Sequence, residues 1–164
     1  MQSAARARAN DAEDETVFAC LIHDLVQCIM QADHGWWGAE LFAPYVSERV
    51  AWSVRYHQAL RFFPDAEAGY EYPDIYREVF GEDYVPEPYL QSAYQYARDH
   101  RWYGYSRAIT VNDDYSFDTD AQNEIEDFAD LIGRHFKQPK EGLGYDNSPS
   151  AHLWRTIIEP DRPL

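Results

Sequence analysis

Five side chains that can ligate a metal ion occur in the order HD, H, H, D: His23 and Asp24, then His34, His57 and Asp113. A metal ion in a protein is held by neutral imidazoles and ionised carboxylates that converge on one point. A helical fold supplies such ligands by turning one or two side chains inward from each of several packed helices. Although spacing alone does not establish convergence, this order predicts a metal site.

The segment around His57 indicates that its imidazole faces the core. In SERVAWSVRYHQALRF, the residues Val50, Val54, His57 and Arg61 follow one helical stripe whose first part is apolar. A buried imidazole needs a polar partner, which a metal ion would provide. Arg61 lies one turn further along the same stripe, where its guanidinium could hold an anionic group or form a salt bridge at the helix end.

The composition limits the possible classes of protein. The 164 residues include 5 Trp, 13 Tyr and 8 Phe, enough for the core of one domain. The formal net charge of -15 argues against a nucleic-acid partner and is compatible with cation binding. No apolar run approaches the length of a membrane span, and the first residues contain no signal-like hydrophobic segment, so we expect a cytoplasmic protein with no membrane partner. Cys20 and Cys28 would lie roughly 12 Å apart along one helix, too far to form a disulfide.

Helical periodicity recurs along most of the chain and predicts an all-α fold. Pro and Gly residues interrupt it between 64 and 88 and again after 138. We therefore expect a helical core over 1–137 and a C-terminal extension over 138–164 that is mostly loop, with a short helix near 153–157. The helices expected in the core cover 2–9, about 11–30, 34–43, a segment that starts after Ser47, 75–80, 87–113 as one broken or two consecutive helices, and 121–136.

The ordered ligand set resembles that of the HD-domain superfamily, all-helical metal-dependent enzymes whose usual pattern is H, HD, H, H, D. The segment GAELFAPYVSERVAWSVRYHQALRFF looks like the third and fourth helices of the branch that includes the phosphonate-cleaving di-iron oxygenases. DHRWY, NDDYSFD and IEDFADLIGRHF look like later segments of small proteins in that branch. The resemblance covers most of the chain and implies an HD-domain helical bundle.

The resemblance also implies how the ligands are shared. Asp24 would bridge two metal ions, with His23 and Asp113 on one ion and His34 and His57 on the other. The first His of the family pattern would fall just before Met1, so we expect a chain truncated ahead of that ligand. Iron is the cofactor that the resemblance favours, with manganese, cobalt and zinc as alternatives, and Asp24 and His57 would be central to catalysis.

Three functions follow as expectations from the resemblance. The first is a di-iron oxygenase that oxidises a small, often anionic, organic substrate, which Arg61 would help to bind. The second is a metal-dependent phosphohydrolase of a phosphorylated small molecule or nucleotide. The third is a binding module that the missing ligand has impaired as a catalyst. His100, His135 and His152 are expected at the surface or in packing, and no feature of the sequence predicts the oligomeric state.

Overall fold

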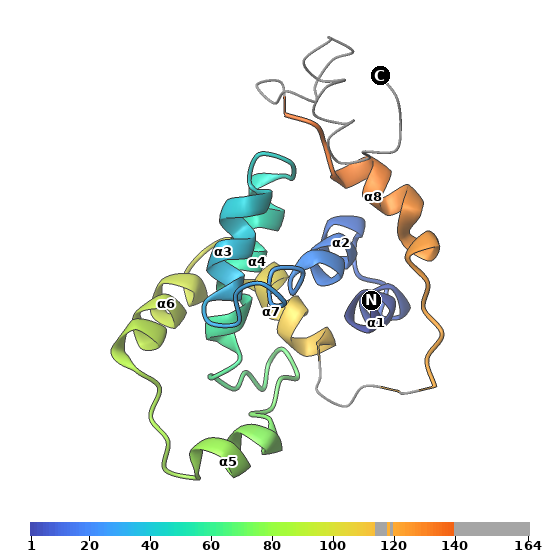
Figure 1. Cartoon of the computed structure of the whole chain (residues 1–164). Coiled ribbons are helices and arrows are strands. Elements are labelled where there is room, and N and C mark those ends of the chain that lie inside the picture. Colours follow the sequence, from blue (N-terminus) through green and yellow to red (C-terminus); the bar gives the residue numbers. More distant parts are fainter. Residues whose placement is uncertain (114–117, 119, 140–164) are drawn as a thin grey trace.

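The computed structural model describes residues 1–113, 118 and 120–139, and within them it is all-helical (Figure 1). This confirms the predicted all-α class. Almost all of the expected extension, including the predicted helix near 153–157, lies outside the described residues. The elements are α1 (Gln2–Ala9), α2 (Asp14–Ile22), α3 (His34–Phe42), α4 (Glu48–Leu60), α5 (Asp74–Phe80), α6 (Pro88–Arg98), α7 (Tyr103–Asn112), the 3-10 helix η1 (Ile125–Phe128) and α8 (Ala129–His135).

Helix α4 is the central element, since it contacts α2, α3, α6 and α7. Its start is fixed by Ser47, which acts as the N-cap and accepts a hydrogen bond from the backbone N–H of Val50, as the sequence predicted. Val50, Val54 and His57 on its inner face are at most 2% exposed. The predicted inward stripe of this helix is therefore confirmed, and it carries the imidazole of His57 into the core.

Helices α1 and α2 pack together on one side of the bundle, and α1 also contacts α7 (Figure 1). Ala4 and Ala7 of α1 are completely buried, and their small side chains allow a close approach of the two helices. Helix α8 contacts α2, and Leu131 of α8 and Phe128 of η1 are buried in the core. The N-terminal helix is thus an integral part of the core.

Two predicted helix boundaries were wrong. The helix expected to continue to about Met30 ends at Ile22, and the following residues form consecutive turns closed by hydrogen bonds between residues three apart. The helix expected from 121 begins instead with η1 at Ile125 and becomes α-helical at Ala129. Apolar side chains continue past Ile22, which is why periodicity overestimated α2, but Leu25 is 57% exposed and contributes little to the core.

A buried arginine of α7 fixes the end of α4. Arg107 is 1% exposed and donates hydrogen bonds to the backbone carbonyls of Leu60 (3.0 Å) and Phe63 (3.0 Å). These carbonyls lie at and beyond the C-terminus of α4, where no intrahelical donor is available. Its guanidinium also lies 3.6 Å from the Asp65 carboxylate. Among the described residues, no helix has the length and apolar character needed to cross a bilayer.

Candidate metal centre

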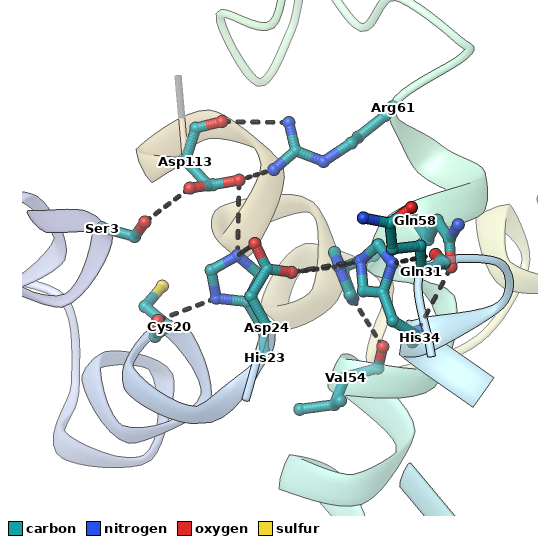
Figure 2. Close-up of polar contacts among 12 residues, drawn as sticks. Ser3, Cys20, His23, Asp24, Gln31, His34, Val54, Gln58, Arg61 and Asp113 are labelled. Carbon is teal, nitrogen blue, oxygen red and sulfur yellow. Dashed lines mark hydrogen bonds and ion pairs between the residues drawn. The ribbon is translucent and has the colours of Figure 1, made fainter. Parts of the chain in front are cut away.

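All five predicted ligands lie at one place, between α1 and α2 on one side and α3, α4 and α7 on the other (Figure 2). His23 is the C-cap residue directly after α2, and Asp24 lies in the turn that follows. His34 is the first residue of α3, His57 lies in the last turn of α4, and Asp113 ends α7. His23, Asp24 and His57 place ligand atoms within 4.8 Å of one another.

Each imidazole is oriented by a backbone carbonyl three residues before it. The Nδ1 atoms of His23, His34 and His57 lie 2.8, 3.0 and 2.6 Å from those carbonyl oxygens. The acceptors belong to Cys20, Gln31 and Val54. Because a carbonyl oxygen can only accept, Nδ1 must carry the proton in all three rings. The Nε2 atom of each neutral ring is then an acceptor with a free lone pair.

The three Nε2 atoms face carboxylate oxygens and one another. His23 Nε2 lies 3.3 Å from Asp24 Oδ2 and 3.3 Å from Asp113 Oδ2. His34 Nε2 lies 3.1 Å from Asp24 Oδ1 and 3.3 Å from His57 Nε2. His57 Nε2 lies 3.6 Å from Asp24 Oδ1. The centre therefore gathers acceptor atoms with no donor hydrogen between them when the rings are neutral.

Such a cluster of acceptors is stable only if a positive charge lies among them. His23 Nε2 and Asp24 Oδ1 are buried and have no hydrogen-bond partner among the described residues, a state that costs roughly 1–3 kcal/mol per group. An ion with bonds of about 2.1 Å would separate adjacent ligand atoms by roughly 3.0 to 3.4 Å in octahedral or tetrahedral geometry. The separations of 3.1 and 3.3 Å fall within that range, and the 3.6 Å between His57 Nε2 and Asp24 Oδ1 lies 0.2 Å above it. The residues present fit a metal ion.

The two oxygens of Asp24 face different histidines. Oδ2 lies beside His23, whereas Oδ1 lies beside both His34 and His57. Figure 2 shows the Asp24 carboxylate between the His23 and His34 rings. A carboxylate in this position can donate one oxygen to each of two ions. That Asp24 bridges two ions, as the family resemblance implied, stays a prediction.

The pKa values of His57 and Asp24 are shifted toward the protonation states that metal binding requires. Burial lowers the pKa of His57 to about 4, although its contact with Asp24 opposes the shift, so the ring is neutral at pH 7. Burial alone would raise the pKa of Asp24, but the neighbouring His23, His34 and His57 hold it well below its usual range. By contrast, burial raises the pKa of the Cys20 thiol to about 12, which leaves it protonated and a poor ligand.

Asp113 is held by two further side chains, Ser3 and Arg61. The Ser3 hydroxyl donates to Asp113 Oδ1 at 2.6 Å. The Arg61 guanidinium donates to the Asp113 backbone carbonyl at 3.1 Å and forms an ion pair with Oδ2. Arg61 was predicted either to bind an anionic substrate or to form a surface salt bridge. The side chain is only 4% exposed, and its ion pair is buried, so the structure gives the guanidinium a partner that neither prediction named.

Two cavities adjoin the centre. A cavity of about 420 Å³ is lined by His23, Asp24 and Asp113 together with Met1, Ser3 and Cys20. A second cavity of about 530 Å³ is also lined by Asp113, together with Tyr70, Tyr72 and Thr110 among others. The Asp24 side chain is 34% exposed. Small molecules can therefore approach the carboxylate that lies between the histidines.

The close approach of α3 to α4 depends on Gly35, a residue that the sequence did not single out. A Cβ atom at this position would lie 3.0 Å from the Val54 carbonyl oxygen and 3.2 Å from His57 Cε1. Its backbone N–H donates to the side chain of Gln58 at 3.2 Å. Because Gly35 follows His34 directly, this contact also sets the distance between the His34 and His57 rings.

The remaining histidines lie away from the centre. His100 stacks on Trp52 at 4.3 Å between ring centroids, and His135 stacks on Phe18 at 5.6 Å. Both take part in packing, as the sequence predicted for them. His152 lies outside the described residues. That the five side chains gathered at the centre ligate a metal ion stays a prediction.

A scan against protein-family models, a search of curated proteins and a search of solved structures gave no match to this chain. The assignment to the HD-domain superfamily accordingly stays a prediction that rests on the order of the ligands and on the quoted segments.

Proposed function

We propose that this protein is a metal-dependent enzyme of the HD-domain type whose centre binds divalent ions through His23, Asp24, His34, His57 and Asp113. The observation behind the proposal is that the Nε2 atoms of all three histidines face carboxylate oxygens. Each Nδ1 atom already donates a hydrogen bond to a backbone carbonyl. Hydrogen bonding among neutral imidazoles and ionised carboxylates cannot satisfy this arrangement, whereas a cation can.

The preferred form of the proposal is an oxygenase-like centre with two iron ions. His34, His57 and Asp24 Oδ1 would bind one ion. His23, Asp113 and Asp24 Oδ2 would bind the other. Two ions are favoured because the Asp24 oxygens are divided between these histidines at 3.1 to 3.6 Å. Iron bound here would supply the chemistry for oxidising an organic substrate with dioxygen.

The chain's own residues have distinct tasks in this proposal. The carbonyls of Cys20, Gln31 and Val54 hold the imidazoles in the metal-binding tautomer. The cavity beside His23 and Asp24 would admit a small organic substrate to the centre. Since Arg61 is already paired with Asp113, its predicted role in binding an anionic group would require the guanidinium to serve both partners.

The proposal is tested by metal content and oxygen uptake. The protein is expressed with added iron, purified without oxygen and analysed for elements per chain, in parallel with an Asp24→Asn variant. We expect iron in the wild-type protein, less than a tenth of it in the variant, and oxygen consumption when candidate substrates are supplied. Asn is nearly isosteric with Asp but carries no charge, so it removes the bridging carboxylate with little change in shape.

Other outcomes would redirect or end the proposal. A single manganese, cobalt or zinc ion with hydrolysis of phosphate esters would replace the oxygenase with the phosphohydrolase. No bound metal after incubation with iron, manganese, cobalt and zinc in turn would refute a metal-dependent enzyme and leave a helical binding module. Equal metal content in the wild type and the Asp24→Asn variant would place the ions elsewhere.

A further inference from the structure

We propose that Ser3 and Arg61 are positioning residues that hold Asp113 in its metal-binding orientation, so that the N-terminal helix α1 is part of the metal centre. This inference rests on the proposed metal function. Figure 2 shows the Asp113 carboxylate between the Ser3 and Arg61 side chains, with one oxygen directed to His23. Neither Ser3 nor Arg61 is itself among the predicted metal ligands.

The position of Asp113 explains why it needs such support. It is the C-cap residue directly after α7, with φ -101° and ψ 63°, and so its orientation is not fixed by a following helical turn. The C-terminus of a helix also carries partial negative charge, which disfavours a carboxylate there. Donors from other elements are therefore required to keep the ionised Asp113 side chain at 4% exposure.

The two donors constrain different atoms of Asp113. Ser3 donates to Oδ1 at 2.6 Å, while Arg61 binds Oδ2 and the backbone carbonyl together. With both contacts in place, rotation of the carboxylate about its last bond would break at least one of them. Oδ2 then stays 3.3 Å from His23 Nε2, the separation that a shared ion requires.

Contacts between distant parts of the chain make the arrangement specific to the folded protein. Ser3 and Asp113 are separated by 110 residues, and Arg61 and Asp113 by 52. Ser3 is 4% exposed, so its hydroxyl has no access to bulk water as an alternative partner. The hydrogen bond from α1 thus couples the docking of this helix to the geometry of the centre.

Two variants test the proposal without changing the charge of the centre. Ser3→Ala removes one hydrogen-bond donor to Asp113. Arg61→Lys keeps the positive charge but loses the guanidinium, whose two terminal nitrogens contact two Asp113 atoms at once. The control is Ser106→Ala, because Ser106 is also fully buried and donates a 2.8 Å hydrogen bond from α7 to the Ser53 carbonyl, away from the metal ligands. Each full-length protein is titrated with Co²⁺ in the absence of oxygen, and its thermal unfolding is recorded with a chelator.

We expect Ser3→Ala and Arg61→Lys each to raise the Co²⁺ dissociation constant about tenfold and to alter the visible absorption bands of the bound ion. Ser106→Ala should change the dissociation constant less than twofold and leave the bands unchanged. With a chelator present, its melting temperature should fall about as much as that of Ser3→Ala. If Ser3→Ala and Arg61→Lys both bind Co²⁺ with wild-type affinity and wild-type absorption bands, the positioning role is overturned but the proposed metal site is not. Failure of the wild-type protein to bind Co²⁺ would instead overturn the proposed function and this inference with it.

Discussion

Substitution of Gly35 by Ala should disturb the helix contact on which the geometry of the centre depends. The added Cβ would meet the carbonyl oxygens of Val54 and Arg55 at 3.0 and 3.3 Å and His57 Cε1 at 3.2 Å. Two of these three neighbours are backbone atoms of α4, which cannot rotate away. Helix α3 must therefore move outward by a few tenths of an ångström, carrying His34 with it.

The magnitude follows from two opposing effects. Overpacking of a tight contact costs about 1–3 kcal/mol, whereas replacing Gly by Ala within a helix stabilises by about 0.5–1 kcal/mol. The net loss should be about 1–2 kcal/mol for Gly35→Ala. In a chain of 164 residues this corresponds to a fall in melting temperature of about 2–8 °C. Displacement of His34 relative to His57 should also weaken Co²⁺ binding about tenfold.

Other glycines of the same chain provide matched controls. A Cβ at Gly133 of α8 would meet no heavy atom within 4 Å, and one at Gly38 of α3 would make only ordinary contacts, the nearest at 3.4 Å. We expect Gly133→Ala to raise the melting temperature by about 1–4 °C and Gly38→Ala to change it little. Thermal unfolding with a chelator, followed by circular dichroism, measures all three. If the Gly35→Ala protein has the same melting temperature as the Gly133→Ala protein and an unchanged affinity for Co²⁺, the expected clash between α3 and α4 is refuted.

Three further predictions concern groups in and around the core. The folded-state pKa of His57 lies below its ordinary value of 6.5 at about 4, so the stability that its neutral ring contributes is complete above pH 6.5 and is lost as the pH falls toward 4. Urea unfolding with a chelator should show a loss of about 3 kcal/mol over this range, and a His57→Gln variant should show a shallower slope. Arg107→Met should cost about 3 kcal/mol because it removes the buried guanidinium that donates to the Leu60 and Phe63 carbonyls, whereas Arg77→Met, at an exposed ion pair, should cost less than about 0.5 kcal/mol. Equal losses in urea unfolding would contradict this. A thiol reagent should modify the exposed Cys28 rapidly in native protein but the buried Cys20 only after unfolding, and rapid modification of both would show that Cys20 is accessible.

The helices and the inward face of α4 were predictable because they depend on local pattern. The stripe of Val50, Val54 and His57 has the helical period, and Ser47 is a favourable N-cap, so the sequence determined both the face and the start of α4. The order of the ligands likewise identified the side chains that converge. These features depend on residues close together in sequence or on a family pattern.

The end of α2 could not be predicted from periodicity, because apolar residues continue past Ile22. Adjacent residues on a helix point about 100° apart, which would keep His23 and Asp24 from facing one ion closely. The structure ends α2 at Ile22, and the turn that follows brings Asp24 Oδ2 to 3.3 Å from His23 Nε2. A requirement of the tertiary structure therefore overrides an apolar pattern that continues through Met30.

The supporting contacts of the centre were also beyond the sequence. Ser3 and Asp113 meet only because α1 packs on α7, and nothing in QSAARARA distinguishes this serine from an ordinary surface residue of a helix. The sequence placed Arg61 one turn after His57, but its partner Asp113 depends on how α7 packs against α4. Gly35 has its role because another helix lies against it.

The central claim is that the five side chains bind a metal ion, and anomalous X-ray diffraction tests it most directly. Crystals grown with Co²⁺ or Fe²⁺ would be measured at the absorption edge of that metal. The account predicts an anomalous peak at bonding distance, about 2.0–2.2 Å, from His57 Nε2 and Asp24 Oδ1, with a second peak beside His23 and Asp113 if two ions bind. Crystals of the same protein with no peak between these residues, or with peaks only at surface carboxylates, would contradict it.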